Sequence, residues 1–242
     1  MSRAQAERSG YLKSFPNLLG CVSCLAGDET DIRALVDGSG AGREWVDALQ
    51  ATDFVLAPAA CYPVYPLVAA RGRLPAEGLR FDVACDCFRH ESTHEVGRLQ
   101  SFRMREFVFL GTPERAVEFR ERWRWRAGAL ADLLLLPHST TAASDPFFGR
   151  ADRMTTVVQG EQELKFKLLI PIRSAEEPTA CMSFNYHRDH FGTIWDIETA
   201  DGGRAHSACV AFGIDRLALA VFTTHGLDLA AWPRQVRQAL VA

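Results

Sequence analysis

Residues 87–107 of the chain read CFRHESTHEVGRLQSFRMREF, and they raise the question of what this part of the molecule does. Arginine and glutamate side chains stand toward both ends of the stretch, and its middle is polar. The segments that enter and leave it, LRFDVACDCFRHE (79–91) and QSFRMREFVFLG (100–111), alternate in polarity, which is typical of β-strands. The pattern therefore predicts two strands joined by a polar loop. They form either a solvated hairpin with cross-strand ion pairs or a strand pair that holds phosphate-binding and metal-binding groups over a site.

The rest of the chain is expected to add further strands and a few helices. A long helix is predicted over 112–136, after a Thr-Pro start, and a second helix over 214–226 ends at its last glycine. Strands are predicted over 163–172, 179–187 and 205–213. Residues 53–67 are expected to form a short strand that enters a proline-rich turn. Two helical pieces are expected over 28–50, with a break at Gly38 and Gly40. This order is not an alternation of strands and helices, and it contains no glycine-rich phosphate loop. It predicts an α+β fold with an antiparallel β-sheet flanked by helices.

Composition and charge limit the class of protein. The 242 residues, 48% of them hydrophobic, suit one large domain with a full core. The net charge of −3 gives no general electrostatic attraction to nucleic acid. No apolar run approaches the roughly 18 residues that a membrane span needs, and the N-terminal MSRAQAERSG has no apolar signal core. With seven cysteines, an odd number, the chain is expected to be a reduced, cytoplasmic protein.

Two arginines are candidates for phosphate binding. Arg89 and Glu91 end one predicted strand and Phe102 lies near the start of the next, so strand pairing would bring them together. An arginine there could bind an α-phosphate, and Phe102 could stack on a purine base. Arg216 follows a strand-to-helix junction, where the start of a helix already favours anions. The alternatives are cross-strand ion pairs for Arg89 and an ordinary surface position for Arg216.

Three residues at the edges of predicted strands, Cys61, Glu106 and Cys209, would suit a metal ion. Two thiolates and a carboxylate, with a fourth position open, form a zinc site that can bind a substrate group. Two other cysteine pairs match metal-ligand spacing better, namely Cys21 with Cys24 and Cys85 with Cys87. The second pair fits the inward face of a strand as small apolar residues, and the first has no companion pair with the spacing of a zinc ribbon.

Several of these segments together carry a resemblance to a known family. CFRHE with SFRMRE resembles motif 2 of class II aminoacyl-tRNA synthetases, and ACVAFGIDR resembles motif 3. Six further segments are similar to amino acid:[carrier protein] ligases, which are truncated relatives of atypical seryl-tRNA synthetases: SFPNLLG (14–20), VLAPAACYPVYP (55–66), DPFFGR (145–150), LKFKLLIP (164–171), SFNYHRDHFG (183–192) and AHSACVAFG (205–213). The resemblance covers nearly the whole chain.

The resemblance implies a fold and an activity. It implies a class II aminoacyl-tRNA synthetase-like sheet in a single catalytic domain, residues 1–242, without a tRNA-binding arm. Such an enzyme activates a small amino acid, glycine or alanine, with ATP to the aminoacyl-adenylate. It then transfers the amino acid to the phosphopantetheine thiol of a carrier protein. By the same resemblance, we expect a homodimer and no tRNA partner, while the lack of a long apolar run argues against a membrane partner.

The resemblance also assigns roles to residues. Zinc is expected on Cys61, Glu106 and Cys209, with its open position taking the amino group of the substrate. Arg89 and Arg216 are the expected catalytic residues. The expected ATP-binding set comprises Arg89, Glu91, Arg98, Leu99, Phe102, Lys165 and Arg216, with Mg²⁺ on the phosphates and Glu177 or Glu198 as its carboxylate. Ser183 and Asn185 are expected to line the amino acid pocket beside the zinc ligands. For Lys165, Ser183 and Asn185, an ordinary polar position on a sheet remains the alternative.

The predicted helix over 113–136 is a hypothesis for the carrier docking surface. It carries five arginines and two tryptophans, and carrier proteins are acidic. The arginines are Arg115, Arg120, Arg122, Arg124 and Arg126. The alternative is a solvated helix face on which glutamates pair with those arginines.

Three other functions remain open. The chain could charge tRNA like a seryl-tRNA synthetase, it could be a non-catalytic paralogue that binds an amino acid or a protein, or it could be a structural zinc protein. Arg89, Glu91 and Arg216 argue against the paralogue, because a mere binder has no need to hold a triphosphate. His94, Glu95 and Lys167 depart from the residues expected in the ligases, which leaves the choice between glycine and alanine open.

Overall fold

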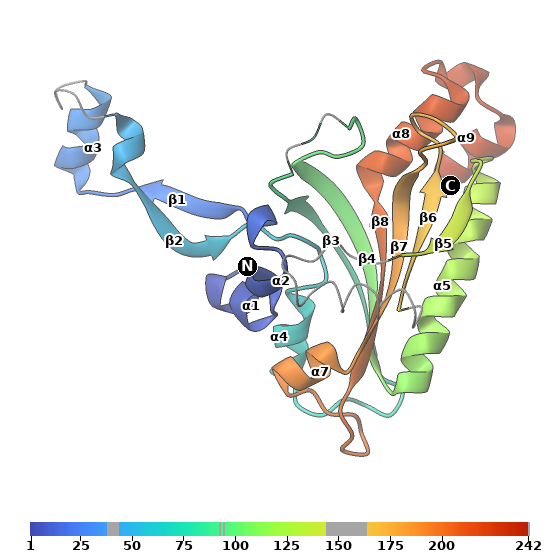
Figure 1. The fold of residues 1–242 in the computed structure, drawn as a ribbon, viewed down its shortest axis with the longest axis horizontal. Helices are drawn as coiled ribbons and strands as arrows, with labels where there is room; N and C mark the ends of the chain where they lie inside the picture. The colour runs from blue at the N-terminus through green and yellow to red at the C-terminus, as the bar shows by residue number, and fades with distance from the viewer. Residues whose placement is uncertain (38–43, 92, 94, 144–163, 242) are drawn as a thin grey trace.

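The computed structural model describes residues 1–37, 44–91, 93, 95–143 and 164–241. Its centre is a six-stranded antiparallel sheet in the order β3-β4-β8-β7-β6-β5 (Figure 1). The strands are β3 Leu79–Phe88, β4 Ser101–Gly111, β5 Ser139–Ala142, β6 Lys165–Ile170, β7 Thr179–Arg188 and β8 His206–Gly213. The predicted antiparallel sheet flanked by helices is confirmed.

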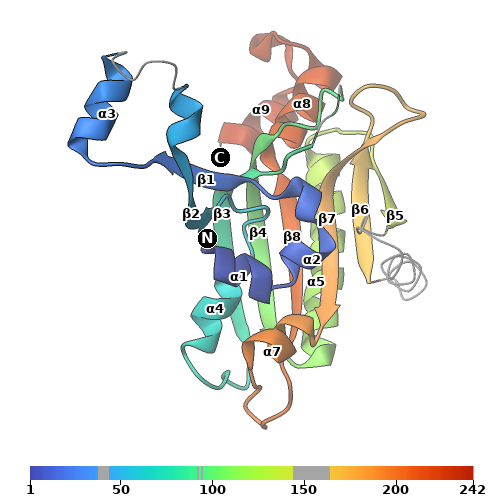
Figure 2. The same cartoon turned by 60° about the vertical axis from the view of Figure 1, so that its left-hand side comes forward.

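Helices lie on both sides of this sheet (Figures 1 and 2). One side carries α5 Pro113–Leu133, α8 Ile214–His225 and α9 Arg234–Val241. On the other side lie the short helices α1 Arg3–Arg8, α2 Tyr11–Ser14, α4 Val64–Ala69 and α7 His190–Trp195. Single 3₁₀ turns occur at Pro16–Leu18, Trp45–Ala48 and Leu229–Ala231.

The two sides have separate cores because successive side chains of a strand point to opposite faces. On β4, Phe109 points to α5, where it stacks on Phe119 with ring centroids 5.5 Å apart. Its neighbours Val108 and Leu110 point the other way, into a core shared with α4 and α7. Helix α7 comes very close to the sheet at Gly192. A Cβ at this position would lie 2.0 Å from the backbone oxygen of Ala205, the residue just before β8. Only glycine fits there, so this contact fixes α7 against the sheet.

Most of the long elements lie where the sequence predicts them. The strand segments of the opening stretch are β3 and β4, and they pair with Cys87 opposite Phe102. The helix predicted over 112–136 is α5, with Thr112 at its N-cap and Pro113 at its first position. Helix α8 follows β8 directly, and it ends at Gly226 with a φ of 82°. The proposed break at Gly38 and Gly40 and the DPFFGR segment lie outside the described residues.

The region around residues 43–69 differs from the prediction. Strand β2, Leu49–Val55, begins inside the second expected helical piece, of which only the 3₁₀ turn at Trp45–Ala48 remains. Residues 64–69 form helix α4 rather than a proline-rich turn. Pro63 is the N-cap of this helix and Pro66 lies in its first turn, where backbone N–H groups have no intrahelical partner to lose. The prolines of this segment are therefore compatible with a helix start.

A smaller unit projects from the main body on the left of Figure 1. It consists of the antiparallel strands β1 Cys21–Leu25 and β2, with helix α3 Glu29–Val36 at its tip. We call residues 21–37 and 44–55 the projecting hairpin. Trp45 and Phe54 on it are 61% and 62% exposed, which is unusual for side chains of this size. Across the described residues, no helix combines the length and apolar character that a membrane crossing requires.

Candidate active site

A cavity of about 890 Å³ lies over the sheet face that α4 and α7 cover. Alternate residues of four neighbouring strands form its floor: Phe102, Met104 and Glu106 of β4, Cys209 and Ala211 of β8, Ser183, Asn185 and His187 of β7, and Lys165 and Lys167 of β6. The register explains this row, because Lys167 faces Ser183, Ser183 faces Ala211, and Ala211 faces Glu106. The cavity is thus a direct product of strand alternation across the middle of the sheet.

The metal ligands predicted from the sequence come together at one end of this floor. The ligand atoms of Cys61, Glu106 and Cys209 all lie within 4.8 Å of one another, and all three residues are buried. Glu106 and Cys209 project from adjacent strands, while Cys61 comes from the turn just before α4. Two thiols and one carboxylate within reach of a single ion are a donor set that suits zinc with a fourth position for another ligand.

The electrostatics of the three residues also fit a cation. Burial, and after it the charge of Cys209, raises the pKa of Glu106 to about 8. The hydrogen bond between the two thiols lowers the pKa of Cys209 well below its usual value and raises that of Cys61, whose pKa is raised by burial as well. Negative charges that are crowded and buried in this way repel one another. A divalent metal ion would remove that repulsion, so the residues present fit the group.

Neighbouring groups hold two of the three ligands in place. The backbone N–H of Ala60 donates to Glu106 Oε1 over 2.8 Å. Asn185 Nδ2 donates to Cys209 Sγ over 3.3 Å, and His187 Nε2 lies 3.6 Å from the same sulfur. Such contacts orient metal ligands in proteins. Asn185, predicted in the amino acid pocket, therefore lies against a candidate metal ligand.

Five of the predicted nucleotide-binding residues lie at the ends of β3 and β4 or between these strands, namely Arg89, Glu91, Arg98, Leu99 and Phe102. Arg89 Nε donates to the backbone oxygen of Pro58 over 2.9 Å, and its guanidinium carbon lies 5.4 Å from the Phe102 ring centroid. Arg98 Nη1 lies 3.2 Å from Glu91 Oε2, and Arg98 also pairs with Glu95. Arg89, Glu91, Glu95, Arg98 and Phe102, together with Leu99, line the cavity. The opening stretch is therefore part of the cavity wall rather than a hairpin exposed on all sides.

Arg216 reaches the same wall from the first turn of α8. Its Nε donates to the backbone oxygen of Gly97 over 2.6 Å, and its Nη1 donates to that of Ala180 over 2.8 Å. Burial lowers the pKa of Arg216, and the positive charge of Arg98 lowers it further. Arg216 therefore lies in the cavity wall and not at an open surface position, which was the alternative for it.

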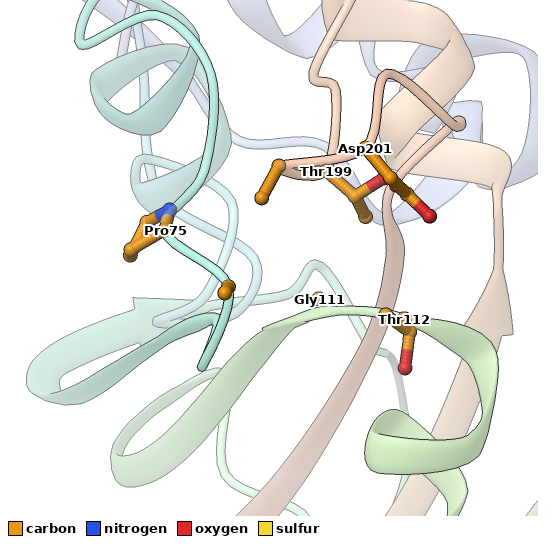
Figure 3. Close-up of a pocket in the computed structure, with 7 residues that line it drawn as sticks. Pro75, Gly111, Thr112, Thr199 and Asp201 are labelled. Atoms are coloured by element: carbon orange, nitrogen blue, oxygen red, sulfur yellow. The ribbon is translucent and has the colours of Figure 1, made fainter.

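The cavity does not include either carboxylate named for Mg²⁺. Glu177 is exposed in the turn between β6 and β7. Glu198 forms an ion pair with Arg73 over 2.8 Å. It directly precedes Thr199, which lines a different cavity of about 180 Å³. Figure 3 shows this small cavity, where Thr199 and Asp201 lie across from Gly111 and Thr112. Among the described residues that line the large cavity, Asp215 is a further carboxylate, and it accepts a hydrogen bond from the backbone N–H of Arg103 over 2.6 Å.

The arginines of α5 are engaged within the molecule, as in the second interpretation of that helix. Arg120 is buried and pairs with Glu121, and Arg124 pairs with the same carboxylate group while its guanidinium carbon lies 3.6 Å from the Phe166 ring centroid. Arg122 pairs with Glu118. Arg115 donates to the backbone oxygen of Ala76, and Arg126 lies over the Trp123 ring. This geometry favours a helix face with internal pairs, and docking of a carrier on α5 stays a prediction.

Sequence reasoning missed one side of the cavity. Residues 9–11, 13–15 and 18 line it from the N-terminal helices, and His187 and His190 line it near the metal ligands. The N-terminal helices are only 6 and 4 residues long, so their periodicity gives no clear signal. The available signal was the pair of aromatic residues Tyr11 and Phe15, spaced four apart as on one face of a helix.

Comparisons with known proteins narrow the interpretation. No protein-family profile matches the chain. The chain is similar to amino acid–[acyl-carrier-protein] ligase 1 of Bradyrhizobium diazoefficiens, with 62% identity over 240 residues that make up 99% of this chain and 74% of the ligase. Its structure is similar to the seryl-tRNA synthetase of M. kandleri in complex with A. aeolicus tRNASec, with a TM-score of 0.82 and 20% identity, covering 99% of this chain and 49% of the synthetase. It is also similar to the seryl-tRNA synthetase of Pyrococcus horikoshii complexed with ATP, with a TM-score of 0.57 and 17% identity, covering 72% and 40%. The structural likeness confirms the predicted class II synthetase-like fold.

Proposed function

Because this chain belongs to the amino acid–[acyl-carrier-protein] ligase family, we propose that it activates an amino acid with ATP and transfers it to the phosphopantetheine thiol of a carrier protein. The observation that carries the proposal is the single cavity that joins two kinds of site. One end holds the buried group Cys61, Glu106 and Cys209, and the other is lined by Arg89 and Arg216. An amino acid has an amine for the first end and a carboxylate to present to a phosphate at the second.

The first half-reaction follows from the charges of the substrates. A carboxylate oxygen of the amino acid forms a bond to the α-phosphorus of ATP, and pyrophosphate leaves with the electron pair of the broken P–O bond. No general base is needed, since the attacking carboxylate is already ionised. The residues therefore act by positioning and by neutralising charge. Arg89 would bind the α-phosphate, Arg216 the terminal phosphates, and Phe102 and Glu91 the adenine ring and its amino group.

Zinc is proposed on Cys61, Glu106 and Cys209, where it would supply a Lewis-acidic site for the substrate amine. Asn185 and His187 contact the sulfur of Cys209 and would hold it toward the metal. Mg²⁺ is proposed with the phosphates of ATP, with much of its shell as water. Lys165 and Ser183, which line the cavity floor, and Leu99 and Arg98, which lie in the loop before β4, complete the proposed contacts.

A small amino acid, glycine or alanine, is the proposed substrate. Aromatic rings close the space behind the two thiols, since Tyr65 is buried and stacks on Phe191 with ring centroids 3.8 Å apart. The His187 ring packs edge-on against Phe191 at 5.0 Å. A small side chain would fit beside these rings with the least displacement of them.

A homodimer is proposed as the working form, with the projecting hairpin as the contact between copies. A two-stranded sheet is at best marginally stable without a partner surface, and the projecting hairpin exposes Trp45 in its 3₁₀ turn and Phe54 on β2. Light scattering on the purified protein should give twice the chain mass, and Phe54→Asp should shift the mass toward the monomer. A monomer in the unaltered protein would remove this part of the proposal.

The decisive experiment is amino-acid-dependent ATP–pyrophosphate exchange with glycine, alanine and serine in turn, before and after zinc chelation. We expect exchange with one small amino acid, its loss on chelation, and its return when zinc is added back. Cys209→Ala should lose both the metal and the exchange. Cys24→Ala is the matched control, because Cys24 is an exposed cysteine on the projecting hairpin and should leave metal content and exchange unchanged.

The other functions predict different results. Aminoacylation of added tRNA in place of a phosphopantetheinylated carrier protein would favour the seryl-tRNA synthetase-like alternative. A folded protein that contains stoichiometric zinc and shows no exchange with any amino acid would favour a non-catalytic paralogue.

A further inference from the structure

The cavity wall contains a buried hydroxyl group that the proposed mechanism does not use. Tyr11 is the first residue of α2, it is only 4% exposed, and it lines the cavity. Among the residues that the structure describes, none forms a hydrogen bond with its hydroxyl. A buried polar group without a partner is costly and uncommon in folded proteins. Tyr11 lines the cavity, so a ligand bound there can supply the partner that the hydroxyl lacks.

The Tyr11 ring is held from two directions. It packs on Phe15 of the same N-terminal segment with centroids 5.4 Å apart, and edge-on against Tyr62 with centroids 5.5 Å apart and an interplanar angle of 83°. Tyr62 is the residue after the candidate metal ligand Cys61. Gly10, at a φ of 76°, makes the turn that leads into α2 and so into this position. Tyr11 is thus anchored beside the end of the cavity that would hold the amine.

The charges that act on the phenol come from the other end of the cavity. They belong to Arg89 and Glu91, with Cys87 of β3 as a third neighbour. Burial raises the pKa of Tyr11 to about 12, with Arg89 acting in the opposite direction. The phenol therefore keeps its proton at neutral pH and can donate a hydrogen bond. Tyr11 thus contacts Tyr62 beside the candidate amine site, and the charge of Arg89, the proposed ligand of the α-phosphate, acts on its phenol.

We propose that Tyr11 donates a hydrogen bond from its Oη to an oxygen of the α-phosphoryl group, in ATP and in the aminoacyl-adenylate. The inference rests on the proposed function and adds a binding residue to it. During activation, the carboxylate oxygen bonds to the α-phosphorus and the pyrophosphate leaves with the electron pair. Tyr11 keeps its proton throughout and stabilises the negative charge on the phosphoryl oxygens together with Arg89. Hydrogen bonds to charged groups are the stronger ones in proteins, so its contribution is expected to be large.

Tyr11→Phe tests this inference because it removes only the hydroxyl and keeps the ring that packs on Phe15 and Tyr62. The value of kcat/KM for ATP–pyrophosphate exchange should fall roughly 10- to 100-fold, the size expected for one hydrogen bond to a charged group. The thermal midpoint should stay the same or rise, since no hydrogen bond to the described residues is lost. An exchange rate equal to that of the unaltered protein would overturn the inference.

A binding experiment identifies the group that the hydroxyl contacts. The probes are AMP, which carries the α-phosphate, and adenosine, which does not. In calorimetric titrations, Tyr11→Phe should weaken AMP binding and leave adenosine binding unchanged. Equal weakening of both, or of neither, would overturn the assignment to the phosphoryl oxygen.

Tyr186→Phe is the matched control for stability. The Tyr186 hydroxyl already has a partner, His206 Nδ1 at 2.6 Å, so its removal should lower the thermal midpoint while Tyr11→Phe does not. A drop of the midpoint in Tyr11→Phe as large as in Tyr186→Phe would mean that the Tyr11 hydroxyl has a structural partner, and would overturn the inference. The outcome is also separable from the proposed function: exchange absent in the unaltered protein would remove that function, whereas exchange equal in both proteins removes only the role of Tyr11.

Discussion

One face of the six-stranded sheet packs against α5, α8 and α9, while the opposite face forms the floor of the cavity and carries the candidate metal ligands. The first face is built from apolar side chains such as Phe109, Val210 and Phe212. The second carries Glu106, Cys209 and Asn185 within the same strands. Neighbours in the sequence therefore have different roles. The Cys209 side chain lines the cavity, and the Val210 side chain packs in the apolar core on the α5 side.

This difference explains why the buried charged groups can stay together. The apolar face supplies the packing that stabilises the sheet, so the other face can keep repelling groups close to one another. Glu106 is fully buried and its pKa is raised to about 8, which a protein selected only for stability would avoid. Substitutions on the two faces should separate activity from stability.

The largest effect is expected for Arg89→Ala on the cavity side. The variant removes a guanidinium that would neutralise charge on the α-phosphate, and kcat/KM for exchange should fall roughly 10²- to 10³-fold. Arg105→Ala is the control on the same strand pair, β3 and β4. Arg105 is exposed and forms its ion pair with Asp82, away from the cavity. Its exchange rate should stay within about two-fold of the unaltered protein. Equal losses of exchange in the two variants would mean that removing any arginine from β3 and β4 lowers activity, and that the phosphate contact of Arg89 is not the cause.

A moderate effect is expected for Val210→Ala on the packing side. Val210 is fully buried beneath α5, and removing its two methyl groups should lower the free energy of unfolding by about 2 kcal/mol. Zinc content and exchange per folded molecule should not change, because the side chain points away from Cys209. Denaturant unfolding monitored by fluorescence, with zinc analysis of the same sample, checks both statements. A loss of zinc in this variant would show that the two faces are coupled.

The sequence predicted the part of the fold that rests on long, regular patterns. Strands β3 and β4 are 10 and 11 residues long and alternate in polarity, and α5 is 21 residues long with a proline start. The resemblance also placed Lys165, Ser183 and Asn185 in the pocket, and they line the cavity from alternate positions of β6 and β7. The three candidate metal ligands could not be found by spacing, because Cys61, Glu106 and Cys209 lie on three separate elements that only the folded sheet brings together.

The sequence failed where short elements depend on tertiary contacts. Helix α4 has 6 residues and contains a proline, and α2 has 4, so neither has a periodic pattern of its own. Both are held by packing, as when Tyr65 of α4 stacks on Phe191. The role of Tyr11 was missed for the same reason. For the arginines of α5, the sequence offered both docking and pairing with glutamates, and it could not show the contacts with aromatic rings such as Phe166.

The smallest effect is expected for Arg122→Glu on the outer surface of α5, which belongs to neither face of the sheet. Arg122 is half exposed and pairs with Glu118 one turn away, and exposed pairs of this kind contribute about 0.3–0.5 kcal/mol. Both half-reactions should therefore stay within about two-fold of the unaltered protein, because neither the cavity nor the apolar core is touched. Pyrophosphate exchange and transfer to a phosphopantetheinylated carrier protein, measured on the same preparation, check this.

If α5 docks an acidic carrier, the reversed charge should slow transfer while exchange is kept, and the effect should weaken as salt is added. That pattern would show that the arginines of α5 bind the carrier although they also have partners within the molecule. The outer surface of α5 would then have a function distinct from those of the two faces of the sheet.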